Sequence, residues 1–247
     1  MRIFLTGGNG FIGGSVAATL IAAGHRVRGL VRNKAKAEVV AAHGIEAVIG
    51  SLDDTGVLHD EARAADAVIN AASSDHRGAV ETLISALSGS GKALIHSSGS
   101  SIVADLAMGE PSDRIYDEAA LVEPLPEKAS RVAIDEKVLA APGIRSVVLC
   151  NTMIYGHALG PPAQSVQIPA LVRQAKASGV VRYIGARIES MVQRPYRRCR
   201  GALSIGAGQG ALRHIHLCRE RRGGTRSNRQ GDRGPTWFRR APILECR

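Results

Sequence analysis

The sequence has few aromatic residues and few cysteines. Phe, Trp and Tyr together make up 3% of the 247 residues. The four cysteines, at positions 150, 199, 218 and 246, form no CxxC pair, and no histidine lies at metal-ligand spacing from a pair of cysteines. Neither a disulfide framework nor a zinc site is therefore expected. We predict no metal site and reduced thiols, which are typical of cytoplasmic proteins.

The sequence also lacks a long apolar run. The longest mainly apolar stretch, residues 10–23, is interrupted by Gly13, Gly14, Ser15 and Thr19, so it is too short to cross a bilayer and is a poor export signal. We expect a cytoplasmic protein with no membrane partner. Its composition, 45% apolar and 22% charged, suits one sizeable core or two small ones and excludes a wholly disordered chain.

Charge divides the chain near residue 186. Residues 1–186 hold 17 basic and 18 acidic groups, whereas residues 187–247 hold 15 arginines, no lysine and 4 acidic groups, a net charge of +11. We therefore predict two parts, a folded domain over 1–186 and a disordered Arg-rich tail over 187–247.

Apolar runs and helical periodicity alternate along the first part. Short runs predict strands, and they alternate with stretches of helical period. Strands that are apolar on both faces belong in a parallel sheet covered by helices on each side. The fold class is therefore α/β with a doubly wound parallel sheet. The predicted strands are 2–6, 26–31, 46–49, 67–70, 93–97 and 146–150, and the predicted helices are 11–23, 34–43, 56–64, 79–88 and 128–140.

A glycine-rich segment, TGGNGFIGG at residues 6–14, joins the first predicted strand to the first helix. Gly7 permits a tight turn, Gly10 leaves room for a diphosphate to approach the backbone, and Gly13 lets the helix pack close to the strand. The helix N-terminus offers N–H groups and a partial positive charge to the phosphates. This arrangement predicts a dinucleotide site.

The TGxxGxxG spacing resembles the short-chain dehydrogenase/reductase superfamily, in its extended or atypical epimerase/dehydratase-like branch. Four further segments fit that branch in order: 50–54 (GSLDD), 70–73 (NAAS), 96–98 (HSS) and 151–156 (NTMIYG). The resemblance implies a Rossmann-like fold in which Asp53 contacts adenine and Ala71 and Ala72 pack beside the adenine ribose.

The resemblance also implies a set of site residues. The cofactor-binding candidates are Gly7, Asn9, Gly10, Phe11, Ile12, Gly13, Arg32, Leu52, Asp53, Ala71, Ala72 and Ser97. The catalytic candidates are Ser98 and Ser100, whose hydroxyls would polarise a substrate carbonyl. His96 lies within a strand, so a structural role in the core is expected for it.

The end of the second strand decides the cofactor. A carboxylate there binds the ribose 2′-hydroxyl of NAD, whereas a cation accommodates the 2′-phosphate of NADP. This chain has Arg32 and Lys34 at that position and no acidic residue until Glu38. NADP is therefore the predicted cofactor, and NAD is the second candidate.

The superfamily's Tyr–Lys pair, four residues apart on one helix, is absent: none of the four tyrosines has a lysine four residues later. The helix expected to carry that pair runs from Glu127 to Ala140. Its sheet-facing stripe is predicted to be Val132, Ala133, Leu139 and Ala140. The chain is in this respect similar to atypical members, and the resemblance leaves its own activity open.

Three interpretations compete for residues 187–247: an Arg-rich arm that binds nucleic acid, a solvated tail without function, or a reading frame shifted near Gly185–Ala186. The third is favoured, because the codons possible for 187–200 and 211–219 can encode, in a shifted frame, amino-acid sequences that resemble those of the superfamily. Any nucleic-acid binding would then be non-specific.

The predicted function is NAD(P)-dependent hydride transfer between nicotinamide and a carbinol or carbonyl carbon of a small-molecule substrate, as in oxidoreductases or sugar-nucleotide epimerases and dehydratases. The alternatives are a non-catalytic NADP-binding redox sensor, as among NmrA-like proteins, and an Arg-rich nucleic-acid binder. A homodimer is left open.

Overall fold

A seven-stranded parallel sheet forms the centre of the protein, in the order β10-β6-β5-β4-β1-β2-β3. In this computed structural model, residues 1–107, 116, 123–184, 193–195, 215–217 and 238–242 are described. The chain order steps outward from β1 to β3 and then returns to continue on the other side, which is the doubly wound topology. The strands are β1 (Arg2–Thr6), β2 (Arg26–Val31), β3 (Glu46–Ile49), β4 (Ala67–Asn70), β5 (Ala93–Gly99), β6 (Arg145–Asn151) and β10 (Ile215–Leu217).

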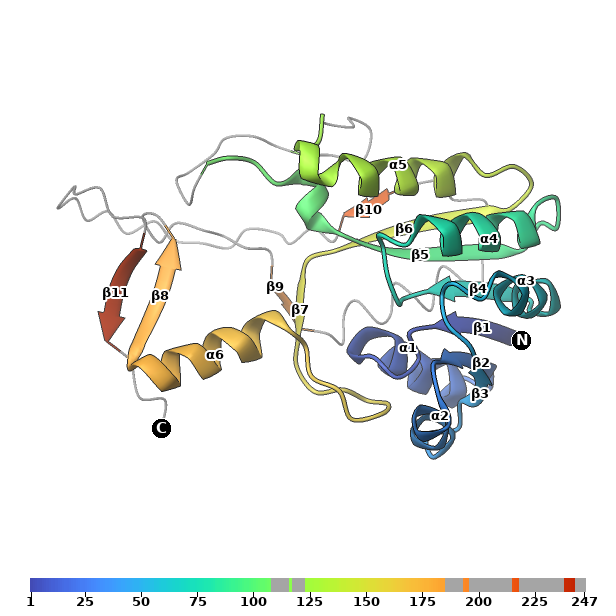
Figure 1. Ribbon diagram of the computed structural model, residues 1–247, viewed down its shortest axis with the longest axis horizontal. Coiled ribbons are helices and arrows are strands. Elements are labelled where there is room, and N and C mark those ends of the chain that lie inside the picture. The colour runs from blue at the N-terminus through green and yellow to red at the C-terminus, as the bar shows by residue number, and fades with distance from the viewer. Residues whose placement is uncertain (108–115, 117–122, 185–192, 196–214, 218–237, 243–247) are drawn as a thin grey trace.

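Helices cover both faces of this sheet (Figure 1). Along β1, Ile3 and Leu5 pack in one apolar cluster with α1 and α2, whereas Phe4 packs in another with α3, α4 and α5. Successive strand residues point to opposite faces, so an unbroken apolar strand serves both clusters. The helices are α1 (Phe11–Ala22), α2 (Lys34–Ala41), α3 (Thr55–Ala64), α4 (Arg77–Leu87) and α5 (Pro126–Ala140).

The predicted α/β doubly wound fold is confirmed, with small differences at the ends of elements. Helix α4 begins at Arg77 rather than Ala79 because the ring of His76 caps it: the Ala79 N–H donates to His76 Nδ1 over 3.1 Å. Strand β5 continues to Gly99, two residues beyond the predicted end, because it pairs with β6 along its whole length.

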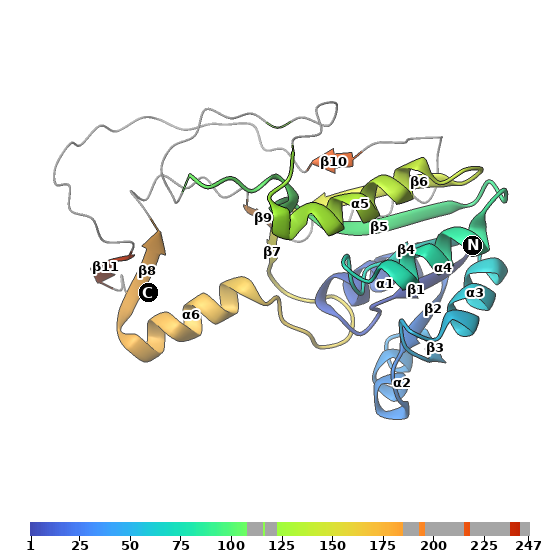
Figure 2. The same ribbon diagram turned by 45° about the horizontal axis from the view of Figure 1, so that its top comes forward.

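Further elements follow β5 and β6 in the chain. They are the 3-10 helix η1 (Ser100–Val103), β7 (Met153–Tyr155), α6 (Gln167–Ser178), β8 (Val180–Ile184), β9 (Gln193–Pro195) and β11 (Phe238–Pro242). Strand β7 pairs with β9 and β8 with β11. In both views α6 and the β8–β11 pair lie beyond the carboxyl edge of the main sheet (Figures 1 and 2).

Three short segments of the predicted Arg-rich tail are described, and each is an extended strand. They are β9, β10 and β11, of which β10 pairs in parallel with β6. The rest of the predicted tail, 187–247, lies outside the described residues. Within the described part of the chain, no helix is both long enough and apolar enough to cross a membrane.

Candidate functional site

The glycine segment forms a turn that cannot hold larger residues. Gly7 has φ +77°, in the left-handed region, and a Cβ on it would lie 2.6 Å from the Ala71 carbonyl oxygen. A Cβ on Gly13 would lie 2.3 Å from the Gly7 carbonyl oxygen. Both distances are far inside van der Waals contact, so α1 approaches β1 closely only because these residues are glycine.

Gly10 is less crowded than Gly7 and Gly13, although a Cβ on it would still make one tight contact. It is the N-cap of α1, and a Cβ on it would meet only the Gly7 carbonyl oxygen, 3.2 Å away. Its residue type offers no side-chain cap, and the first turn of α1 carries no acidic residue. A helix N-terminus of this kind attracts anions through its dipole and its N–H groups. The turn therefore fits a diphosphate group.

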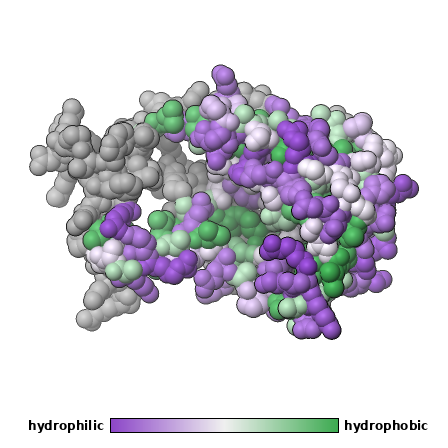
Figure 3. Space-filling model, viewed as in Figure 1, coloured by the Kyte–Doolittle hydropathy of each residue, from purple (hydrophilic) through white to green (hydrophobic). Residues whose placement is uncertain are grey.

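A cleft of about 750 Å³ opens at this turn and follows the carboxyl edge of the sheet. Figure 3 shows apolar side chains around a hollow in this region. Of the predicted site residues, those that line the cleft are Gly10, Phe11, Ile12, Ala71, Ala72, Ser97, Ser98 and Ser100. The structure thus brings the glycine turn, the end of β4 and the end of β5 to one cavity, as is usual for ligand sites in such sheets.

The remaining predicted residues do not line this cleft: Gly7, Asn9, Gly13, Arg32, Leu52 and Asp53. Leu52 packs against the apolar cluster of α3 and α4. The Asp53 side chain is exposed, and its Oδ1 lies 3.1 Å from Nε2 of His76. Gly7 and Gly13 shape the turn without lining the cleft.

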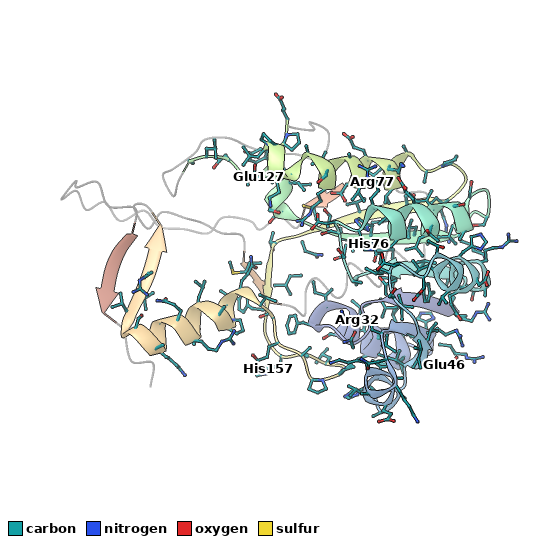
Figure 4. All side chains as sticks on the ribbon, viewed as in Figure 1. Arg32, Glu46, His76, Arg77, Glu127 and His157 are labelled. Atoms are coloured by element: carbon teal, nitrogen blue, oxygen red, sulfur yellow. The ribbon has the colours of Figure 1, made fainter. Side chains whose placement is uncertain are left out.

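Arg32 follows directly after the end of β2. Strand β2 carries two other arginines, and both are in ion pairs: Arg26 with Glu46, and Arg28 with Glu46 and Glu61. Arg32 makes no hydrogen bond or ion pair to any other described residue. Figure 4 shows Arg32 toward the carboxyl edge of the sheet and Glu46 toward the opposite end. The Arg32 guanidinium is thus exposed and is not engaged by another described residue.

A chain of buried polar contacts crosses the sheet near the cleft. The Ser98 hydroxyl donates to Asp135 Oδ2 on α5 over 2.6 Å, and the other oxygen, Oδ1, lies 3.4 Å from Nε2 of His96. The other ring nitrogen of His96, Nδ1, lies 3.0 Å from the amide nitrogen of Asn70. Asn70 in turn accepts from the Thr6 hydroxyl over 2.5 Å. These contacts connect β1, β4 and β5 to α5.

Burial sets the protonation of the two titratable groups in this chain. It raises the pKa of Asp135 to about 6, although the Ser98 hydrogen bond and the Arg131 charge act in the opposite direction. Burial also lowers the pKa of His96 to about 4, with a further contribution from Arg131. Both groups are therefore neutral between about pH 4 and 6, and the 3.4 Å contact is not an ion pair at those pH values.

Arg131 and Asn151 complete the polar rim of the cleft. The Arg131 guanidinium binds Asp75 through two nitrogens, one of them 2.7 Å from Oδ1, and donates to the Ser101 hydroxyl over 3.1 Å. It therefore lowers the pKa of Asp75. The Asn151 amide donates to the Ser97 hydroxyl over 2.6 Å. The start of the 151–156 segment, at the end of β6, thus contacts β5 directly.

The predicted sheet-facing stripe of α5 was right in part, since Val132 and Leu139 are partly buried against the apolar cluster of α3, α4 and α5. Ile134, Asp135 and Val138 are the buried residues of this helix, and Ala140 is exposed. With Arg131 they occupy positions i, i+3, i+4 and i+7, which form one helical face. Apolar residues alone do not show this face, because two of its four members are charged. The i, i+4 pair of Arg131 and Asp135 was the signal that could have identified it.

A second contact that the sequence did not predict holds the loop after β7 against α1. A Cβ on Gly160 would lie 2.2 Å from the Gly14 carbonyl oxygen, and the Leu159 N–H donates to the Ser15 hydroxyl over 3.0 Å. The chain then continues through residues 163–167, which line the cleft. This loop therefore closes one side of the cavity.

Metal-ligating residues do not gather in the described part of the chain, where no three or more His, Cys, Asp or Glu side chains are placed to hold an ion. Cys150 is buried and forms no disulfide. The other three cysteines lie outside the described residues.

Comparison with known proteins decides the family. The model of the NmrA-like family matches residues 1–133, which is more than half of the chain. The chain belongs to the NmrA-like family. Oxidase ucsJ of an Acremonium species is 32% identical over 241 residues, with 87% of this chain and 62% of that protein covered. A 4-hydroxy-2-methyl-3-oxo-4-farnesyl-3,4-dihydroquinoline-1-oxide ketoreductase of Stigmatella aurantiaca is 30% identical, with 63% of this chain and 51% of that protein covered.

This NmrA-like chain thus spans between half and two thirds of the length of these relatives. Solved structures share its fold. The dTDP-glucose 4,6-dehydratase of Bacillus anthracis, in complex with NAD, superposes with TM-score 0.68 at 18% identity, over 87% of this chain and 74% of that one. Yeast methylglyoxal/isovaleraldehyde reductase, complexed with NADPH, has TM-score 0.53 at 16% identity, over 64% and 60% of the two chains. These structures share the Rossmann-like fold that the resemblance to the short-chain superfamily predicts.

Proposed function

We propose that this protein is an NADP-dependent oxidoreductase that transfers hydride between nicotinamide and the carbonyl or carbinol carbon of a small-molecule substrate. The observation that carries the proposal is the continuity of the cleft: one cavity joins Gly10, at the anion-binding helix end, to Ser98, at the end of β5. A dinucleotide needs a diphosphate site at one place and a reacting place further along, and the cleft offers both. The names of the two relatives, an oxidase and a ketoreductase, support this class.

The residues that would hold NADP follow from their positions. The amide-rich turn around Gly10 would bind the diphosphate, and Ala71 and Ala72 would flank the adenosine part. Arg32 would bind the 2′-phosphate because, unlike the two arginines on β2, it is not paired with Glu46 or Glu61. Bound NADPH would supply the hydride.

Substrate polarisation would fall to hydroxyls at the end of β5. Ser98 and Ser100 both line the cleft. Ser98 has a fixed orientation because Asp135 accepts its hydrogen bond, whereas no hydrogen bond to another described residue fixes the Ser100 side chain. Ser98 is therefore the better candidate for the group that contacts the substrate oxygen.

Titration of the whole protein with NADPH and with NADH by calorimetry tests the cofactor assignment. We expect NADPH to bind at least tenfold more tightly. Absorbance at the nicotinamide band, followed with a panel of aldehydes and ketones, then tests turnover. A folded protein that binds neither coenzyme at millimolar concentration would contradict the proposed function.

A non-catalytic NADP sensor is the second candidate. The described residues of α5 include no tyrosine, so the phenol that serves short-chain enzymes as proton donor is missing from that helix. Tight NADPH binding with no turnover of any carbonyl in the panel would favour the sensor.

A cytoplasmic location and a homodimer stay predictions, which fractionation and light scattering would test. The third candidate is an Arg-rich nucleic-acid binder. RNA binding that weakens steeply with salt, and that the cell needs for its growth, would favour it.

A further inference from the structure

The hydrogen bond between Ser98 and Asp135 creates a conflict for carbonyl reduction. The single hydrogen of the Ser98 hydroxyl is directed at Asp135 Oδ2, 2.6 Å away. While Asp135 is a carboxylate it can only accept, so this hydrogen is not available to a substrate oxygen. If Asp135 carries a proton, the carboxyl group can donate to Ser98 Oγ instead. The Ser98 hydrogen is then free to turn into the cleft that Ser98 lines.

The surrounding contacts fix which atoms hold protons. The Ser73 carbonyl can only accept, so the Asn70 atom 3.3 Å from it must be the amide nitrogen. That nitrogen also donates to His96 Nδ1, 3.0 Å away, which makes Nδ1 an acceptor. The proton of neutral His96 is therefore on Nε2, facing Asp135 Oδ1. Neither Nε2 nor Asp135 Oδ1 makes a hydrogen bond to a described residue, and His96 offers Asp135 no basic nitrogen, so it cannot take the proton of Asp135.

Asp135 is isolated from water and from direct cationic partners. Its side chain is 1% exposed. The nearby guanidinium of Arg131 is bound to Asp75 and Ser101 instead. The charged or titratable groups around Asp135 are Arg131 and Glu136 on α5, His96 on β5, Asp75 after β4 and Cys150 on β6. The described residues of η1 bring no charged group, and Glu81 of α4 is bound to Lys137.

We propose that Asp135 is a positioning residue that supplies, through the Ser98 hydroxyl, the proton that the substrate oxygen takes during carbonyl reduction. The inference rests on the proposed oxidoreductase function and adds its proton source. The carbonyl carbon accepts the hydride, and the electron pair of the C=O π bond takes the Ser98 proton. Ser98 Oγ then takes the proton of Asp135, which becomes a carboxylate. After product release, water in the cleft supplies a proton to Ser98 Oγ while the Ser98 hydroxyl hydrogen passes to the Asp135 carboxylate, which restores both groups.

This relay would donate the proton that a tyrosine phenol donates in other members of the superfamily. Its two groups, Ser98 and Asp135, are in direct buried contact. The burial that raises the pKa of Asp135 to about 6 keeps a protonated fraction near neutral pH. Oxidation of an alcohol would use the same contacts in the opposite direction, with the carboxylate as the proton acceptor. Reduction is therefore expected to slow, and oxidation to accelerate, as the pH rises through the pKa of Asp135.

The first test compares Asp135→Asn with Glu136→Gln, a matched change of the neighbouring exposed carboxyl. We expect D135N to bind NADPH as wild type does but to reduce a carbonyl at least about 100-fold more slowly at pH 5.5. Its residual rate should not vary between pH 5 and 8, whereas wild type and E136Q slow as the pH rises. The double variant S98A/D135N should be no slower than S98A, because the two residues act in series.

The second test does not use activity. Carbon-13 NMR of labelled aspartate carboxyls in the whole protein should show one group that titrates near pH 6. This signal should be missing in D135N and should move to higher pH in Ser98→Ala, because the Ser98 hydrogen bond lowers the pKa of Asp135. If D135N does not fold, the wild-type and S98A titrations still decide.

The outcomes separate the inference from the function on which it rests. No NADPH binding by wild type contradicts the proposed function. NADPH binding and turnover, with D135N keeping the rate and pH profile of wild type, overturns the relay alone. A titration in which every aspartate carboxyl ionises below about pH 5 overturns the relay whatever the activity.

Discussion

Gly13 and Gly7 are in backbone contact across the first turn of the fold. A Cβ on Gly13 would lie 2.3 Å from the carbonyl oxygen of Gly7 and 2.7 Å from its carbonyl carbon. Gly7 is itself held by its positive φ and by the Ala71 backbone. The obstacle to a side chain at residue 13 is therefore backbone that is fixed on its other side, so it cannot yield as a flexible side chain would.

Gly13→Ala should therefore destabilise the protein and weaken coenzyme binding together. We expect the free energy of unfolding to fall by at least about 2 kcal/mol, as for overpacked sites, and NADPH affinity to fall because α1 shifts away from β1. Urea denaturation and calorimetry measure the two effects. Gly56→Ala is the control: a Cβ there meets no atom within 4 Å, and the residue lies in helix α3. It should be neutral or stabilising. Equal stability of G13A and wild type would contradict the packing argument.

Arg32→Ala should lower affinity for NADPH but not for NADH. The guanidinium has no ion pair to another described residue, so its removal should cost the 2′-phosphate contact alone. We expect about a tenfold weaker Kd for NADPH, which corresponds to about 1.4 kcal/mol. Titration with both coenzymes checks this.

Arg63→Ala is the matched control for that change. Arg63 is an exposed arginine in the last turn of α3. The R63A variant should therefore bind both coenzymes as wild type does. A variant R32A that loses NADH and NADPH affinity equally would show that Arg32 supports the fold of the site instead of selecting the phosphate.

The sequence predicted the fold well because local pattern decides most of it. Strands such as Ala67–Asn70 are short, apolar and buried on both faces, and the glycine turn follows the first of the strands. Asp135 was missed because its importance depends on a contact with Ser98, 37 positions earlier. Helix α6 was missed because none of its residues is buried, so no apolar stripe marks it.

The Arg-rich residues 187–247 carry a separate prediction. We expect the nucleotide sequence around codon 186 to show a shifted frame that continues with family-like codons. The match to oxidase ucsJ opposes this, since its 87% share of the chain is larger than residues 1–186. Sequencing the gene decides: a shifted frame that soon meets a stop codon would reject the prediction. In that case the arginines belong to the protein's native sequence.

The neutral pair of His96 and Asp135 predicts an unusual pH dependence of stability. His96 has a folded pKa of about 4 against an ordinary 6.5, so the unfolded chain binds more protons there and stability is lost as the pH falls from 6.5 to 4. Asp135 has a folded pKa of about 6 against an ordinary 3.8, so the folded chain binds more protons and stability is gained over nearly the same fall in pH. The two contributions oppose each other.

Asp135→Asn should therefore make stability more sensitive to acid. Between pH 6.5 and 4, unfolding of wild type releases the Asp135 proton and adds a proton to His96. The number of bound protons hardly changes, so this pair contributes almost nothing to the pH dependence of the free energy of unfolding. In D135N the His96 contribution stands alone, because a neutral amide replaces a neutral carboxyl beside His96 and burial still lowers the pKa of His96. The free energy of unfolding should then fall by about 1.4 kcal/mol for each pH unit relative to wild type. Urea denaturation at pH 6.5, 5.5 and 4.5 measures the difference. Parallel curves for the two proteins would mean that His96 and Asp135 are not both neutral in the folded state, and the proton assignment on which the Ser98 relay depends would be lost with them.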